Sequence, residues 1–221
     1  MVRLGFDWID VVVSDNHFSL NERVLPAYLA AYEVLHKTHL ERVEECKQSI
    51  AKVASQEEYA DARSELDDEE YRWQEQTQAL AAMALSLTAS ANKSFLDQMK
   101  RLFASTHPAD SQYFGKGQLL KQLTEYKGRF GLDLEKLRHF STIREVELAR
   151  HCCVHDDGRL SADYRAQTGQ RLVGTHGYID LTPEMLTSIL SEIYEFAHAL
   201  SVEMKKARDA QRRVEKGDSP L

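Results

Sequence analysis

The chain has 221 residues, of which 43% are hydrophobic and 29% charged, so it is long enough and apolar enough to bury a core. Its formal net charge is −7, which argues against a protein that coats nucleic acid without regard to sequence, because such proteins neutralise phosphates with an excess of Lys and Arg. The chain contains 4 Pro and 10 Gly, a low content that favours long helices over a sheet-rich fold.

Nothing in the sequence predicts insertion into a membrane or export. The N-terminus has no basic region followed by an apolar run, and no apolar run approaches the roughly 20 residues that span a bilayer. The three cysteines, Cys46, Cys152 and Cys153, make no disulfide framework, and their odd number favours a reducing compartment. We therefore expect a cytoplasmic protein.

The N-terminal third of the chain predicts one long helix after an irregular start. Residues 1–18 are expected to be irregular or to include a short strand. Ser19 and Glu22 have the spacing of a capping box, and apolar residues then recur three and four apart, which predicts an amphipathic helix to about residue 50. Pro26 lies early in this helix and is expected to shift its start or to kink it.

An acidic segment separates this helix from a second long one. Residues 56–75 are strongly acidic, with four consecutive carboxylates at residues 67–70. We interpret the segment as a solvated helix face or a turn between helices; the alternative is a docking site for a basic partner. Residues 77–103 then show helical periodicity with many Ala, Ser and Met, which suits close helix packing. A shorter helix is expected from residue 119 to about 128.

The last part of the chain predicts two further helices. Asp133 is expected to cap a helix over residues 134–155, which ends abruptly at Asp-Asp-Gly, residues 156–158. A polar loop follows, and residues 171–181 are expected to add a small β-hairpin. Pro183 occupies a favourable first helical position for a final helix with an apolar stripe. Together these elements predict an all-α bundle of about five main helices with long antiparallel N-terminal helices.

The helix that ends at residue 155 has an apolar stripe that becomes polar over its last two turns. With His155 at zero on a helical wheel of about 100° per residue, His151 lies at roughly 40°. Glu147 lies at roughly 80° and Arg150 at roughly 140° on the same wheel. Each unpaired polar group that is buried costs several kcal/mol of folding free energy, so the polar residues on this face need hydrogen-bonding partners. The partner is substrate, solvent in a cleft, or the same face of a second subunit.

Residues 150–158, Arg-His-Cys-Cys-Val-His-Asp-Asp-Gly, resemble the Arg-Asn-x-x-x-His motif of the HEPN superfamily (higher eukaryotes and prokaryotes nucleotide-binding), which closes a helix and leads into a turn. The resemblance covers roughly residues 115–205. It implies an all-helical homodimer that meets through the motif helix and cuts RNA without a metal. His151 stands where the family most often has Asn. Asp157 stands where toxins silenced by nucleotidyltransferase antitoxins have Tyr, so control by modification at that position is not expected.

The spacing of Arg and His is weak evidence without its context. Arg171 and His176 have the same spacing, but they lie in a Gly-flanked segment that is not expected to be helical. Arg150 and His155 follow a periodic helix, precede a helix stop, and are followed by another long helix. The family motif is therefore assigned to Arg150 and His155.

The resemblance and the chemistry of the side chains assign roles to four residues. His155 is the expected general acid or base, and Arg150 the expected clamp on a phosphate. Glu147 is placed to orient Arg150 or His151, and His151 takes the position-holding role of the usual Asn or acts as a second base. A dimer would bring two copies of each residue into one composite site. No cofactor and no metal are expected.

Other interpretations of the same residues stay open. The cluster is alternatively a buried ion-pair network at an interface, or His151 and His155 are an i, i+4 metal pair, although no third ligand is evident. His36 and His39 are also close in sequence, and a packed or surface role is favoured for them.

The sequence thus predicts one HEPN-like domain over residues 19–210 and a flexible tail over 211–221. The first functional hypothesis is an endoribonuclease that acts as a toxin or phage-defence effector, with RNA as substrate and an antitoxin or regulatory protein as a further partner. The alternative hypothesis is a non-catalytic dimeric interaction module that binds a protein or nucleotide partner through the acidic segment or the motif face.

Overall fold

The computed structural model describes residues 8–104, 119–174 and 177–215, and every structural statement below concerns these residues. The fold is an all-α bundle, as predicted, and the described residues contain two isolated β-bridges but no strand. The α-helices, in chain order, are α1 (Trp8–Phe18), α2 (Leu25–Lys52), α3 (Gln56–Ala104), α4 (Leu119–Phe130), α5 (Phe140–His155), α6 (Ala162–Gln167) and α7 (Pro183–Glu215).

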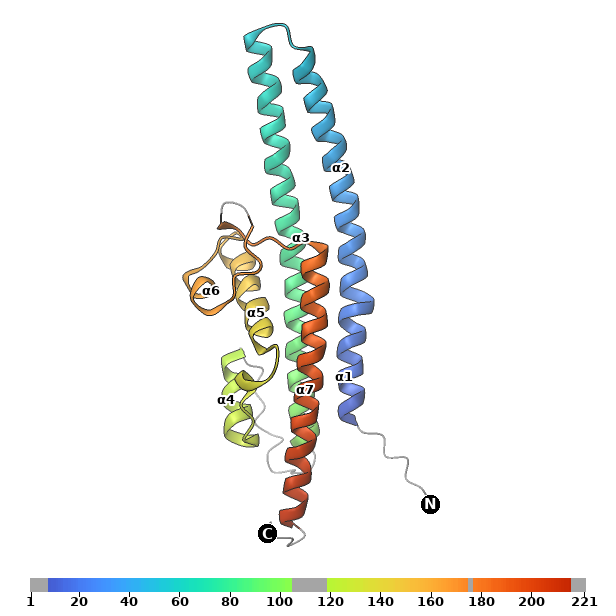
Figure 1. Ribbon diagram of the computed structural model, residues 1–221, viewed down its shortest axis with the longest axis vertical. Helices are drawn as coiled ribbons and strands as arrows, with labels where there is room; N and C mark the ends of the chain where they lie inside the picture. The colour runs from blue at the N-terminus through green and yellow to red at the C-terminus, as the bar shows by residue number, and fades with distance from the viewer. Residues whose placement is uncertain (1–7, 105–118, 175–176, 216–221) are drawn as a thin grey trace.

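Helices α2 and α3 form an antiparallel pair whose outer half extends well beyond the other helices as a two-helix arm (Figure 1). Residues 53–55 make the turn between them. Ser55 and Glu58 form a reciprocal capping box, because Ser55 N donates to Glu58 Oε2 at 3.3 Å and Glu58 N donates to Ser55 Oγ at 3.2 Å. The acidic segment is therefore the beginning of α3, and its carboxylates lie mostly on the solvated face that was predicted.

The expectation of irregular structure over residues 1–18 is wrong for residues 8–18, which form α1. The reason is visible in the spacing of its apolar residues. Ile9, Val12 and Val13 recur three and four apart and are all buried, so the helix packs one face on the core. The valine run favours a strand by local propensity, and tertiary packing overrides that preference.

The helix predicted to begin at Ser19 does not begin there, because the chain is already helical. A π-helical turn, Ser19–Val24, joins α1 to α2 without a side-chain cap. In a regular α-helix the ring of Pro26 would collide with the carbonyl group of Glu22, four residues earlier. The wider turn just before Pro26 is a known way to relieve such a conflict, so the proline changes the helix geometry where a kink or a later start was expected.

The motif helix also begins later than predicted. Leu134–Lys136 is a single 3-10 turn, Asp133 makes no capping hydrogen bond, and α5 starts at Phe140. The interruption occurs at His139, whose φ of 61° places it in the left-handed region. Its ring lies near two carboxylates of α7, with Nδ1 3.5 Å from Glu192 and Nε2 3.1 Å from Glu195. These long-range contacts hold a backbone conformation that local sequence does not predict.

The segment between α5 and α7 contains α6, which was not predicted, and an antiparallel pairing in place of a full hairpin. Ser161 caps α6 by accepting a hydrogen bond from Tyr164 N at 3.1 Å. Gly174 N donates to Tyr178 O, and Asp180 N donates to Leu172 O, each at 2.9 Å. The pairing amounts to single bridges, and the tip of the expected hairpin lies outside the described residues.

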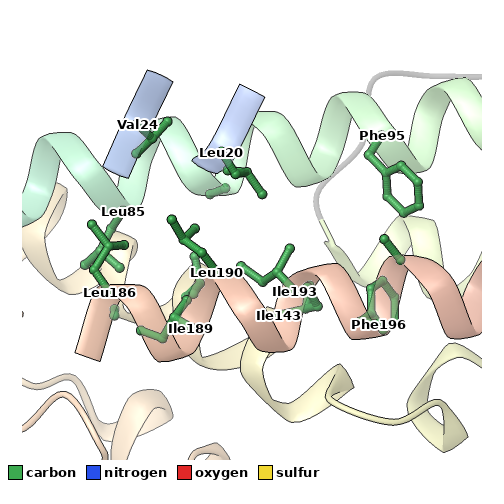
Figure 2. Packing of buried hydrophobic residues seen from close by; sticks show 14 of the residues in the cluster. Leu20, Val24, Leu85, Phe95, Ile143, Leu186, Ile189, Leu190, Ile193 and Phe196 are labelled. Carbon is green, nitrogen blue, oxygen red and sulfur yellow. The ribbon is translucent and has the colours of Figure 1, made fainter. Parts of the chain in front are cut away.

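Helix α7 begins at Pro183, as predicted, and forms the centre of the hydrophobic core. Figure 2 shows its apolar face between the π-helical turn and α3 on one side and α5 on the other. The α7 residues labelled there are Leu186, Ile189, Leu190, Ile193 and Phe196. The helix runs to Glu215, so the predicted tail boundary at residue 211 is too early, and residues 216–221 lie outside the described part of the chain.

A membrane-spanning helix is not found among the described residues, since none of their helices is both long and apolar enough.

The central position of α7 predicts a large stability loss on truncation of its core residues. Ile193 is fully buried, so Ile193→Ala should lower the free energy of unfolding by about 2–5 kcal/mol through lost burial and an empty cavity. Val34→Ala, at an exposed position of α2, should change it by about 0.5 kcal/mol or less. Urea unfolding followed by circular dichroism gives both values, and equal losses would contradict this account of the core.

Candidate functional site

Helix α5 ends where the sequence predicted, at a turn built from two left-handed residues. Asp157 has a φ of 50° and Gly158 a φ of 78°. The amides of Asp156 and Gly158 both donate to Cys152 O at 3.0 Å, which satisfies the end of the helix. The last two turns of α5 are thereby held at the surface of the bundle, where α5 packs along α3 (Figure 1).

The four predicted site residues all lie on the solvent-accessible side of α5. Arg150 and Glu147 are half-buried, and Arg150 Nε donates to Glu147 Oε2 at 3.1 Å. Glu147 therefore contacts Arg150, one of the two partners predicted for it. His151 and His155 are exposed, and their ring centroids are 4.6 Å apart. Among the described residues, the carboxylate in ion-pair range of His151 is that of Asp156, with Oδ2 3.8 Å from Nδ1.

A cleft of about 530 Å³ opens beside the motif. Arg150, His151 and Glu147 line it, whereas His155 lies one turn further on and is not part of its wall. The other lining residues come from four helices: Ser86, Ala89, Ser90 and Lys93 of α3, Leu119 and Leu123 of α4, Arg144 and Leu148 of α5, and Asp163 and Gln167 of α6. A volume in this range is typical of small-molecule and single-nucleotide sites.

Two cations of the cleft were missed by sequence reasoning. Lys93 is distant in sequence and comes from α3, so only the folded structure places it beside the motif. Within the described residues no carboxylate lies in ion-pair range of Lys93, and Arg144 pairs with Glu135 at the surface. Arg144 precedes the motif by six residues, so its helical position was readable, but nothing in the sequence marked it as part of the site.

The overall negative charge of the chain is concentrated away from this cleft. Residues 33–76, which form the arm and its base, carry thirteen Asp and Glu and six Lys and Arg, a net charge of −7. The other residues carry twenty-two of each sign and are neutral as a group. The net charge that argued against a non-specific nucleic-acid binder therefore describes the arm, and it does not argue against an anionic ligand at the motif.

The adjacent cysteines do not supply a reactive nucleophile. Cys152 is buried and accepts a hydrogen bond from Ser161 N at 3.3 Å. Burial raises the pKa of the Cys153 thiol to about 12, so this thiol stays protonated near neutral pH.

The alternative metal interpretations gain no further ligands from the fold. Among the described residues no group of three or more His, Cys, Asp or Glu side chains is placed to hold a metal ion. His39 stacks on Trp73, with centroids 4.7 Å apart, and lies 3.5 Å from Glu69, which is the packed role favoured for it.

Arg171, which has the same spacing to a histidine as Arg150, is part of a buried structural network. Its Nε donates to Glu145 Oε2 at 2.9 Å and its backbone N donates to Glu145 Oε1 at 2.7 Å. Tyr164 OH donates to the same carboxylate at 2.8 Å. Arg171 Nη1 also donates to Glu192 of α7 at 2.7 Å. The network connects α5 to its neighbours. The histidine of this second pair, His176, lies outside the described residues.

Comparisons with models of protein families, with curated proteins and with solved structures each gave no match. The function is therefore inferred from the geometry and chemistry of the motif helix and its cleft.

The two arginines should respond differently to replacement. Arg171→Leu leaves the buried carboxylate of Glu145 without its cation, so it should lower the free energy of unfolding by about 2–3 kcal/mol. Arg150→Leu breaks a half-exposed ion pair and should cost at most about 1 kcal/mol. Chemical denaturation measures both. A loss for Arg150→Leu as large as that for Arg171→Leu would show that the motif is a structural ion-pair cluster.

Proposed function

We propose that the protein is a metal-independent endoribonuclease of HEPN type that works as a homodimer. The observation that carries this proposal is the exposure of the polar end of α5. Arg150 reaches a cleft, and His151 and His155 face solvent in ring contact with each other. A structural cluster would bury and satisfy these groups, as the network around Glu145 does.

The reaction uses the substrate's own 2′-hydroxyl as nucleophile. Its oxygen forms a bond to the adjacent phosphorus while the bond from phosphorus to the 5′-oxygen breaks. One base takes the proton of the 2′-hydroxyl, and one acid gives a proton to the departing 5′-oxygen. The products are a 2′,3′-cyclic phosphate and a 5′-hydroxyl.

The motif side chains suit these steps. Imidazole accepts and donates protons near neutral pH, which fits His155 as acid or base and His151 as its partner or as a positioning group. Arg150 keeps its charge at any working pH and offers parallel donors to two phosphate oxygens. Glu147 holds the guanidinium at the cleft through the 3.1 Å hydrogen bond.

A second copy of the chain would complete the site. One chain supplies a single Arg150 and a single His155, and a two-fold axis beside α5 would bring the second pair opposite the first. Exposed apolar side chains lie on α5 and on the helix that packs along it: Val154, one residue before His155, is 50% exposed, and Met83 and Leu87 of α3 are also exposed. Burial of such side chains favours association.

The resemblance suggests the setting in which such a nuclease works. By that resemblance we propose a cytoplasmic toxin or phage-defence effector, restrained by an antitoxin or another regulatory protein.

The arm favours a second candidate function, a non-catalytic interaction module. It extends away from the motif and carries a net charge of −7, so it is a surface on which a basic protein partner would dock (Figure 1). This module would be inert toward RNA, and its α5 site would serve only to join subunits.

Cleavage assays with a chelator present separate the two candidates. Purified wild-type protein should cut RNA, and His155→Ala should reduce the rate by about 100- to 10,000-fold through loss of proton transfer. Arg150→Ala should reduce it by about 100- to 1000-fold through loss of charge stabilisation. Arg138→Ala, which removes an exposed ion pair with Glu195, is the matched control and should cut normally. Undiminished cutting by His155→Ala would sink the assignment.

The dimer is tested by a charge placed at its proposed centre. Val154→Asp should convert a dimer into a monomer, because a carboxylate would be buried without a partner at the two-fold axis. Light scattering after gel filtration measures the mass, and circular dichroism checks that the helices persist. The monomeric variant should lose cleavage. A wild-type monomer that cuts RNA fully would contradict the composite site.

A further inference from the structure

A small polar cavity adjoins the floor of the cleft. Asn92 of α3 and Gln122 of α4 line it together with Leu96 and Ile143. Lys93, Leu119 and Glu147 line both the cavity and the cleft, so the two spaces lie against each other. The cavity itself holds about 10 Å³, which is the room of about one water molecule or one amino group.

Asn92 is the unusual residue of this cavity. Its side chain is only 5% exposed, and neither its Oδ1 nor its Nδ2 has a hydrogen-bond partner. Gln122 is 2% exposed; its Nε2 donates to Asp97 Oδ1 at 2.8 Å, but its Oε1 has no partner. Buried amide groups are nearly always paired because leaving them unpaired costs free energy. Two such amides at one cavity leave three hydrogen-bonding atoms that a polar group bound there would satisfy.

The unpaired atoms define the hydrogen bonds that this group must make. Asn92 presents one donor and one acceptor side by side, and Gln122 adds a second acceptor because its donor is occupied by Asp97. A matching edge has an acceptor next to an amino group with two hydrogens. On the Watson–Crick edge, adenine and cytosine carry that combination; guanine has a ring N–H between its acceptor and its amino group, and uracil has no amino group. The amino group fits the small cavity, and the ring stays in the larger cleft.

The cleft has the other features that an unpaired nucleotide needs. Leu119, Leu123 and Leu148 give it apolar surface for the faces of a base. Three cations of its walls, Lys93, Arg144 and Arg150, outnumber the two carboxylates there, Glu147 and Asp163, which favours the flanking phosphates. All of these groups lie on the same side of α5 as the motif.

We infer that Asn92 and Gln122 form a base-reading subsite for one unpaired adenosine or cytidine of the RNA that the motif cuts. This inference rests on the proposed ribonuclease function. It gives the protein a preference for single-stranded RNA with an amino-bearing base next to the cleaved bond.

The test measures binding by full-length protein with the His155→Ala substitution, which prevents cleavage and lies outside the cleft wall. The probes are three fluorescent RNA heptamers, UUUAUUU, UUUCUUU and UUUUUUU, and the readout is anisotropy. The A- and C-containing heptamers should bind at least about tenfold more tightly than the uridine heptamer, in the range of one good bidentate contact. Adding Asn92→Leu should remove that difference, so that all three heptamers bind with similar affinity.

Control variants separate base reading from a structural effect. Asn16→Leu removes another buried Asn with an unpaired oxygen, in α1 and outside the cleft, and should keep the base preference. Gln122→Met is the second test variant if Asn92→Leu fails to fold, and it should reduce the difference in affinity between the uridine heptamer and the A and C heptamers. Two results would overturn the subsite: equal binding of all three heptamers, or a base preference that persists in Asn92→Leu. Either result would mean that the cavity holds only a structural water. Absence of any RNA binding overturns the proposed function as well.

Discussion

The buried carboxylate of Glu145 is the interaction on which the position of the motif helix depends. It accepts hydrogen bonds from Tyr164 OH and from two nitrogens of Arg171, and Arg171 continues the network to Glu192 of α7. Since the carboxylate is only 4% exposed, its charge needs these donors, and they fix the orientation of α5 about its own axis.

That orientation divides the polar residues of α5 into two sets. Glu145 and Glu147 are about 200° apart on the helix, so when one faces the network the other faces the cleft. Arg150 pairs with Glu147, and His151 and His155 follow on the exposed side. The same helix thus carries a buried, fully paired cluster on one face and a more exposed polar cluster on the other, which is the physical basis for proposing that the second is functional.

Much of this arrangement could be predicted from sequence because it is local. The Asp-Asp-Gly sequence predicts that α5 ends at His155, and Pro183 predicts the start of α7. The spacing of residues along α5 predicts that its apolar stripe becomes polar over the last two turns. The beginning of α3 was also readable, since Ser55 and Glu58 have the capping-box spacing, and the solvated helix face predicted for the acidic segment agrees with its mostly exposed carboxylates.

The features that sequence reasoning missed depend on contacts between distant residues. His139 adopts a left-handed conformation because carboxylates of α7 lie beside it, and this delays α5. Lys93 lines the cleft, and Asn92 the adjoining cavity, only because α3 packs along α5; Gln122 of the same cavity comes from α4. Their chemistry is ordinary in isolation. It becomes informative when the fold buries two amides beside a cationic cleft, which no spacing rule anticipates.

Arg150 and His155 are proposed to promote attack by the 2′-hydroxyl of RNA. This role is tested most directly by mapping the preferred cut in an RNA oligonucleotide and then replacing that one 2′-hydroxyl with hydrogen. With a chelator present, the normal strand should be cut to a 2′,3′-cyclic phosphate and a 5′-hydroxyl, and the substituted strand should resist cleavage at the same bond. Equal cutting of both strands there would contradict it.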